Sequence, residues 1–134
     1  MTPGEVEIKI AAADGDIHLC RVSYISGPSV ALTVRSPMFG EGTFTAPDLF
    51  DALVAFRLYL EARGYLLLCN AARRDAYPSR MAREMGGGRK VYLLCMGCQA
   101  RMSDLVDSLE EASLELVTTV AAQKAAYEAW LDSL

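Results

Sequence analysis

Apolar residues recur at every second position through the first third of the chain, and this periodicity constrains the fold more than any other feature. Val6, Ile8 and Ile10 alternate with charged residues, and residues 17–25 repeat the pattern beyond an Asp14-Gly15 turn signal. Alternation with a period of two is typical of strands buried on one face, and Asp-Gly favours a tight turn between two such strands. The pattern predicts an antiparallel meander with strands over residues 5–12, 17–25, 30–34 and 39–44.

The periodicity changes to that of a helix near residue 45. Large apolar side chains then fall on one helical stripe, as expected of a helix that buries one face. These residues are Leu49, Leu53, Phe56 and Leu60. Thr45 and Asp48 resemble a capping box, and Gly64 supplies a stop signal. A helix is therefore predicted over residues 45–63.

Two short, continuously apolar segments follow, at residues 65–70 and 91–96. Runs of this kind fit strands that are covered on both faces, in the middle of a sheet. Further on, Ser103 is expected to cap a helix, with Asp104 and Asp107 in its first turn. That helix would carry Leu105, Val106 and Leu109.

The C-terminal region is expected to contain one more helix. The β-branched run at residues 117–120 disfavours an uninterrupted helix, so a break or a short strand is predicted near residues 112–118. The last helix is predicted over residues 119–133. It is expected to bury Val120, Tyr127, Trp130, Leu131 and Leu134.

These elements add up to one α+β domain over residues 1–134, with a mainly antiparallel sheet of about six strands packed against two or three helices. A chain of 134 residues, 52% of them hydrophobic, is long enough for a single core. Its longest apolar runs are far shorter than the roughly 20 residues of a membrane helix, and no signal-peptide pattern opens the chain. A cytoplasmic protein without a membrane partner is expected.

The cysteine and histidine pattern does not favour a metal or catalytic centre. Cys95 and Cys98 form a C-x-x-C, but only Cys20, Cys69 and the single histidine, His18, remain as further soft ligands. A redox motif would place the pair at a helix N-terminus, whereas Cys95 is expected to end a strand. Reduced structural thiols, a structural His18, no metal and no cofactor are therefore predicted. Enzymatic activity is disfavoured, although the sequence leaves the question open.

The connection between the two apolar runs is the most specific feature of the chain. Residues 73–103 carry seven basic and two acidic residues, within a protein whose net charge is −4. A connection of this length in a compact domain is usually functional or mobile. It is predicted to be a protein- or anion-binding surface, with a plain solvated loop as the open alternative. The candidate residues are Asn70, Arg73, Arg74, Tyr77, Ser79, Arg80, Arg83, Arg89 and Lys90.

Nucleotide-binding motifs do not explain this connection. Ser79 is a plausible cap for a short helix ending at Met85, and the glycines at 86–88 follow this helix and precede a strand. A P-loop or a dinucleotide fingerprint needs a different spacing, with the glycines leading into a helix. Nucleic acid is also disfavoured as a partner, because the pI is about 5.0 and only Tyr77 and Tyr92 offer stacking surfaces.

Three segments of this region carry a family resemblance. They are Leu-Leu-Leu-Cys-Asn-Ala-Ala-Arg-Arg at 66–74, Tyr-Pro-Ser-Arg-Met at 77–81 and Met-Gly-Gly-Gly-Arg-Lys at 85–90. Within residues 48–134, the chain resembles small uncharacterised bacterial proteins. Some of these are encoded beside polymorphic or contact-dependent inhibition toxins and are taken to be immunity proteins. The resemblance implies a cytoplasmic protein that binds and neutralises a cognate toxin domain.

An acidic segment offers a second candidate surface. Immunity proteins against nucleases often present carboxylates to a basic substrate groove, although ordinary helix solvation also accounts for such a face. The candidate residues are Asp104, Asp107, Glu110, Glu111 and Glu115. The alternative function is a small anion- or nucleotide-binding regulator or enzyme that uses the arginine-rich connection at residues 70–90.

Overall fold

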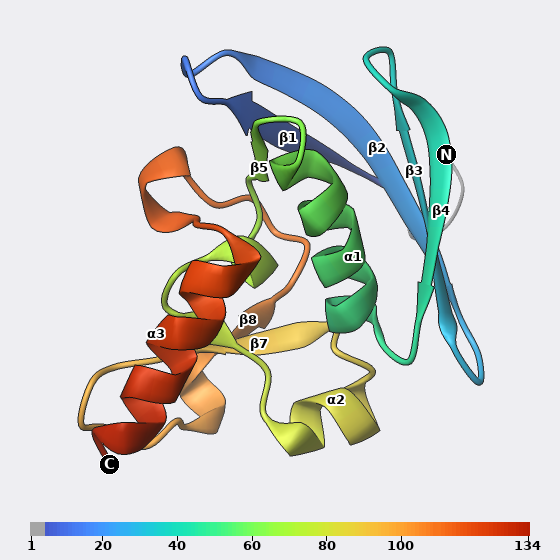
Figure 1. Ribbon diagram of the computed structural model, residues 1–134. Helices are drawn as coiled ribbons and strands as arrows, with labels where there is room; N and C mark the ends of the chain where they lie inside the picture. Colours follow the sequence, from blue (N-terminus) through green and yellow to red (C-terminus); the bar gives the residue numbers. More distant parts are fainter. Residues whose placement is uncertain (1–4) are drawn as a thin grey trace.

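The computed structural model describes residues 5–134, so the first four residues of the predicted domain lie outside the described part (Figure 1). The strands and helices alternate irregularly along the chain. The strands are β1 (Val6–Ala12), β2 (Ile17–Ser26), β3 (Val30–Ser36), β4 (Gly40–Ala46), β5 (Tyr65–Leu67), β6 (Ala76–Tyr77), β7 (Lys90–Leu93) and β8 (Leu105–Asp107). The helices are α1 (Leu49–Glu61), α2 (Arg80–Gly86) and α3 (Val120–Asp132), with 3₁₀ turns η1 (Asn70–Ala72), η2 (Met102–Asp104) and η3 (Leu114–Leu116).

The predicted meander forms the larger of two sheets, in the order β4-β3-β2-β1-β5. All four of its pairings are antiparallel, and their register places Ile8 opposite Cys20 and Leu32 opposite Phe44. The alternating apolar residues of β1 to β3 are buried on one face, as the period of two predicts. The predicted α+β class is confirmed.

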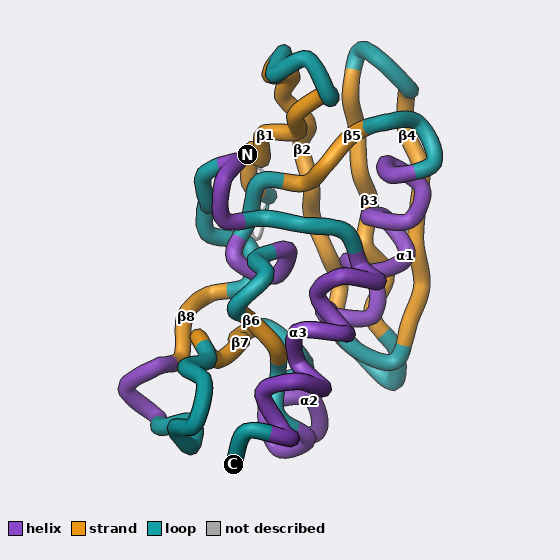
Figure 2. The backbone as a smooth tube through the Cα atoms, turned by 60° about the vertical axis from the view of Figure 1, so that its left-hand side comes forward, coloured by secondary structure: helices purple, strands orange, loops and turns teal. Residues whose placement is uncertain are grey.

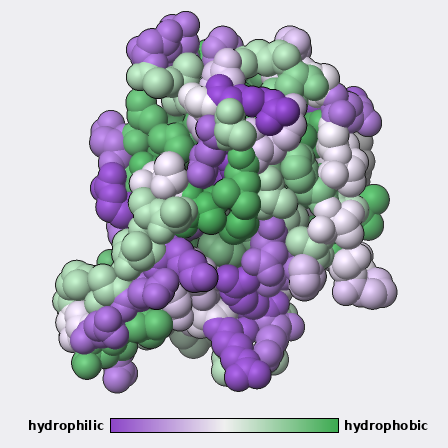
Figure 3. All heavy atoms as spheres, viewed as in Figure 1, coloured by the Kyte–Doolittle hydropathy of each residue, from purple (hydrophilic) through white to green (hydrophobic). Residues whose placement is uncertain are grey.

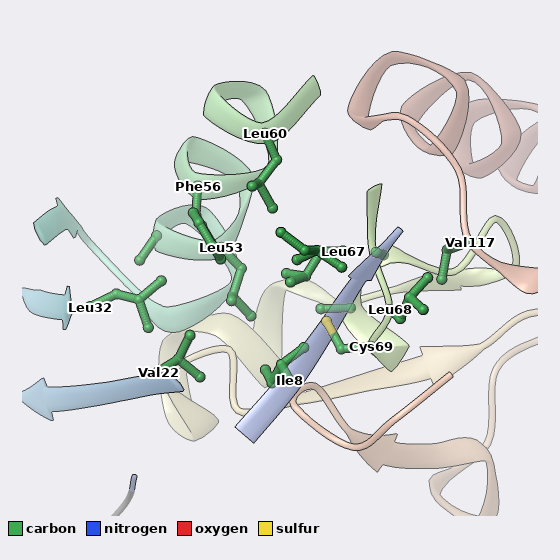
Figure 4. Packing of buried hydrophobic residues seen from close by; sticks show 14 of the residues in the cluster. Ile8, Val22, Leu32, Leu53, Phe56, Leu60, Leu67, Leu68, Cys69 and Val117 are labelled. Carbon is green, nitrogen blue, oxygen red and sulfur yellow. The ribbon is translucent and has the colours of Figure 1, made fainter. Parts of the chain in front are cut away.

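Helix α1 covers the inner face of this sheet. Its predicted stripe is fully buried, and Figure 4 shows Leu53 and Phe56 directed into the interior beside Leu32 and Val22 of the sheet, with Leu60 directed towards Leu67. The predicted start at residue 45 is wrong, because Thr45 pairs within β4. Asp48 is the N-cap instead, and its Oδ1 accepts from the Asp51 backbone N–H at 2.8 Å.

The remaining strands form a separate sheet, in the order β6-β7-β8, beyond one end of the larger sheet (Figure 2). The prediction of two mid-sheet strands over residues 65–70 and 91–96 is only half right. β7 is the central strand of the small sheet, whereas β5 lies at the edge of the large one. The apolar segment after β5 is not part of either sheet. It is buried because residues 68–71 exchange backbone hydrogen bonds with residues 108–112.

The helix predicted from Ser103 is also wrong. Residues 102–104 form η2, and residues 105–107 then pair with β7, placing Leu105 opposite Tyr92 and Val106 opposite Val91. The Asp104 carboxylate accepts from the Arg101 backbone N–H at 3.0 Å rather than serving in a helical first turn. Pairing with an existing strand satisfies backbone groups that a helix would have to satisfy locally.

The last predicted helix is confirmed as α3, capped by Thr119, whose hydroxyl accepts from the Ala122 backbone N–H at 3.2 Å. The predicted break before it is the 3₁₀ turn η3. The predicted buried face is partly wrong, because Trp130 is buried but Leu131 and Leu134 are exposed. Gln123 is buried instead.

A polar network joins α1 to α3 inside the apolar interior. The buried Arg57 guanidinium donates to the carbonyl oxygens of Ala71 (3.2 Å) and Thr118 (2.9 Å), and to Oε1 of Gln123. Nε2 of Gln123 donates in turn to three backbone carbonyl oxygens in residues 71–76, at 2.7 to 3.0 Å. Burial lowers the pKa of Arg57, and the negative charge of the nearby Glu61 partly offsets this decrease. This network fixes the turn after β5, and with it the start of the arginine-rich connection.

In the described part of the chain, none of the helices combines the length and the apolar character needed to cross a membrane.

Candidate functional site

An open groove of about 1050 Å³ lies between α2 and the small sheet. We call it the methionine groove, because three methionines belong to its mostly apolar wall. Met81 and Met85 come from α2, one helical turn apart, and Met102 comes from η2. Val6 of β1, Tyr24 of β2 and Leu105 of β8 also line the groove. The groove therefore joins the two sheets and the short helix.

The three methionines are among the most exposed apolar side chains described. The exposed fraction is 67% for Met81, 79% for Met85 and 81% for Met102. Side chains in this state add little to the stability of the fold, because most of their apolar surface remains in water. Methionine is flexible and polarisable, so such side chains can adapt to the shape of a bound partner.

Helix α2 carries two of the methionines although it buries none of its own residues. It is held by its ends. The Ser79 hydroxyl accepts from the Ala82 backbone N–H at 3.0 Å, which confirms the predicted cap. At the other end, Gly87 lies in the left-handed region at φ 65°, and its carbonyl accepts from the Leu49 backbone N–H at 2.8 Å.

The next residue, Gly88, brings the connection against the first turn of α1. Its φ is 72°, which favours glycine, and a Cβ at this position would lie 2.7 Å from the Phe50 backbone nitrogen. The Gly88 carbonyl also accepts from the buried Ser108 hydroxyl at 2.8 Å. The glycines at 86–88 thus form the predicted helix end, but Gly88 serves close packing rather than flexibility.

Arg83 anchors the middle of α2 to α1. Its Nη1 lies 2.9 Å from Oδ1 of Asp51 and 3.7 Å from Oδ2 of Asp48, and its guanidinium lies 4.9 Å from the centre of the Phe50 ring. Burial opposes the cation, but the hydrogen bond and the charges of the two carboxylates outweigh it and raise the pKa of Arg83. Arg83 therefore positions α2 and is not available to a ligand.

Four of the other predicted binding residues, Asn70, Arg73, Tyr77 and Arg80, also have partners within the protein. Arg73 forms two hydrogen bonds of 2.8 Å with the Asp75 carboxylate, and Arg80 lies 3.0 Å from Glu84. Asn70 is buried and donates to the Asp107 carbonyl at 3.1 Å. The Tyr77 ring stacks on Tyr127 at a centroid distance of 4.0 Å, and Arg74 is exposed.

Figure 3 shows hydrophilic side chains over the lower edge of the molecule, where Figure 1 places α2. The structure thus spreads the arginines over the surface and does not gather them around one anion.

Arg89 and Lys90 differ from the other cations of the connection. Both line the methionine groove, and neither has a carboxylate within 4.0 Å among residues 5–134. Nε of Arg89 donates only to the Gly86 carbonyl, at 3.0 Å. These two side chains leave their charge open to a partner that enters the groove.

Some of the acidic candidate residues also line the methionine groove, and the others do not. Asp107 and Glu110 line the methionine groove, with Asp107 opposite Lys90 in the register of β8 and β7. Glu111 pairs with Lys9 at 3.2 Å. Asp104 lies against Arg101 and Glu115 is exposed on η3; neither residue lines the groove. The two surfaces that the sequence nominates separately therefore share one wall, through Arg89, Lys90, Asp107 and Glu110.

Sequence reasoning missed the apolar part of this site. Met81 and Met85 stand four residues apart in an otherwise polar segment, which is the one local signal of an apolar edge on α2. Val6 and Tyr24 follow the strand alternation and look like ordinary core residues. Their place beside α2 follows only from the packing of the two sheets.

The cysteines fall into two classes. Cys20 and Cys69 are buried, and burial raises their pKa to about 12 and about 11. Cys95 and Cys98 are exposed, and Cys95 lies beyond the end of β7 rather than in a strand. His18 packs edge-to-face on Tyr65 with ring centroids 6.0 Å apart. Within residues 5–134, no three histidine, cysteine or acidic side chains are grouped so as to hold a metal ion.

No protein-family model matches the chain, and comparison with curated proteins finds no match. The function must therefore be inferred from the geometry of the site.

Proposed function

We propose that the protein is an immunity-type protein that neutralises a cognate bacterial toxin domain by binding it in the methionine groove. The observation that carries this proposal is the exposure of Met81, Met85 and Met102 around one concave surface. Protein interfaces are enriched in methionine, aromatic residues and arginine at their buried cores. Contiguous exposed apolar surface on a soluble domain marks binding sites of this kind.

The charged residues that line the groove would orient a bound toxin segment. Arg89 and Lys90 line the groove together with Asp107 and Glu110. A toxin segment that places apolar side chains against the methionines and charges of both signs along one edge would match this arrangement. Complementary charges of this type mainly determine specificity and association rate, while the apolar contacts supply most of the affinity.

The alternative function, a small anion- or nucleotide-binding protein, receives less support from the contacts. Tight anion binding needs several donors that converge on one point. Arg73, Arg80 and Arg83 are each engaged by a carboxylate of the protein, and only Arg89 and Lys90 are open at the groove. An apolar groove with two cations fits a protein surface better than a phosphate.

The proposal is tested by placing charge in the groove. The double variant Met81→Glu/Met102→Glu is expected to weaken binding of the toxin encoded by the neighbouring gene at least ~100-fold, because burying two carboxylates without partners is costly. Binding is measured by isothermal titration calorimetry, and protection by survival of cells that express the toxin. The variant protein is expected to fold normally, because both side chains are exposed.

Met96→Glu is the matched control. Met96 is 63% exposed but does not line the groove, so this variant is expected to bind and protect like the wild type. An equal loss of binding in both variants would place the binding surface elsewhere. Absence of both complex formation and cell protection with the wild-type protein would refute the toxin-neutralising function itself.

A further inference from the structure

The connection from β7 to β8 contains a tight turn that presents two cysteines to solvent. The Cys98 backbone N–H donates to the Cys95 carbonyl at 3.0 Å, and Gly97 adopts φ 76° at the third position of the turn. This is the geometry of a β-turn with glycine where a positive φ is required. Such a turn holds its first and fourth residues within about 7 Å, close to the separation that a disulfide spans.

The two thiols already face each other across this turn. The Sγ atoms of Cys95 and Cys98 lie 3.2 Å apart, with Cys98 donating to Cys95. Both side chains are exposed, so a small molecule in solution reaches them directly. Cys20 and Cys69 are buried, and they provide an internal reference for unreactive thiols in the same protein.

Helix α3 holds the turn in place from behind. Nε1 of Trp130 donates to the carbonyl oxygens of both Cys95 (2.9 Å) and Cys98 (3.0 Å). The Gly97 backbone N–H donates to the Ser133 hydroxyl at 2.8 Å, and that hydroxyl donates to the Trp130 carbonyl at 2.6 Å. One indole thus fixes the first and last residues of the turn, which keeps the two thiols together.

We propose that Cys95 and Cys98 form a thiol–disulfide exchange site that reacts with low-molecular-weight disulfides such as oxidised glutathione. The thiolate of one cysteine attacks a sulfur of the glutathione disulfide, forming a mixed disulfide and releasing one glutathione thiolate. The second cysteine of the protein then loses its proton and attacks the protein's own Sγ in the mixed disulfide. This attack forms the bond between Sγ of Cys95 and Sγ of Cys98 and releases the second glutathione as its thiolate. The protein loses two electrons and two protons, and the glutathione disulfide is reduced to two thiols.

The electrostatics set the conditions for this reaction. The hydrogen bond and the charge of Cys98 raise the pKa of Cys95, so the Cys95 thiol does not ionise readily. Because the thiolate is the attacking species, the exchange is expected to be faster at pH 8 to 9 than at pH 7. Once the first mixed disulfide has formed, the short Sγ–Sγ approach favours closure over release.

The test equilibrates the full chain with defined ratios of reduced and oxidised glutathione, followed by acid quenching and intact-mass measurement. The native protein is expected to lose the mass of two hydrogen atoms. Its equilibrium constant for disulfide formation is expected to exceed that of the same chain in concentrated urea at least ~10-fold, because the folded turn raises the effective concentration of the two thiols. Cys95→Ser and Cys98→Ser are expected to stop at the mixed disulfide, whereas Cys20→Ala is expected to behave like the wild type.

A positioning role for Trp130 gives a second readout. Trp130→Phe removes both hydrogen bonds to the turn and is expected to lower the native equilibrium constant several-fold, while Tyr127→Phe, which keeps the neighbouring ring, is expected to leave it unchanged. Circular dichroism verifies that both variants are folded. An equilibrium constant no larger in the native protein than in urea, or only mixed disulfide in the native wild type, would overturn the proposal.

Discussion

Arg57→Met is expected to lower the free energy of unfolding by about 3 kcal/mol. The substitution keeps most of the side-chain volume but leaves the Thr118 carbonyl and Oε1 of Gln123 without their donor inside the protein. Each buried acceptor that loses its partner costs about 1–3 kcal/mol. The measurement is urea denaturation followed by circular dichroism, with equal slopes required for the wild type and the variant.

Arg63→Met is the matched control for this prediction. Arg63 lies just beyond the C-terminus of α1 and is exposed; its guanidinium donates to the Tyr59 carbonyl and lies over the Tyr59 ring. A change of no more than ~0.5 kcal/mol is expected for an exposed arginine of this kind. Equal destabilisation by the two substitutions would show that the buried network does not hold α1 and α3 together.

Gly88→Ala is expected to destabilise the protein by roughly 3 kcal/mol, from backbone strain together with a steric clash. The new Cβ would lie 2.7 Å from the Phe50 backbone nitrogen, and backbone in the first turn of a helix cannot move aside as a flexible side chain can. Thermal unfolding measures the loss. Binding in the methionine groove is expected to weaken as well, because the connection from α2 to β7 must shift.

Gly87→Ala separates the two contributions. Gly87 also has a positive φ, of 65°, but no atom lies within 4 Å of its added Cβ. Only the strain of about 1–2 kcal/mol is expected there. If both alanine variants were destabilised equally, the close contact between Gly88 and Phe50 would contribute nothing.

The first four strands and the two long helices were predictable because their signals are local. Alternation in β1 to β3 and the apolar stripe of α1 each need only a window of neighbouring residues. The division into two sheets was not predictable in this way. An apolar run such as residues 65–70 must be buried. Its sequence does not specify whether it pairs with neighbouring strands of a sheet or with the distant residues 108–112.

The residues of the candidate site also differ in whether the local sequence indicates their role. The arginine-rich connection and the acidic segment stand out by composition, and four of their charged residues do reach the groove. The pairing of Arg83 with Asp51 joins residues 32 positions apart, so no local pattern indicates that this cation is already engaged. The methionines were missed because an exposed apolar residue cannot be distinguished from a core residue without the packing.

The position of Gln123 has a consequence for how the protein is made. Its side chain, with that of Arg57, closes a network that joins α1, the turn after β5 and α3, across sequence separations of 47 to 66 residues. A nascent polypeptide can form the N-terminal meander and α1 on the ribosome, but Arg57 lacks two of its partners, Thr118 and Gln123, until translation has passed α3. Until then a charged side chain points into an open apolar surface, so the emerging chain is expected to depend on chaperones that shield such intermediates.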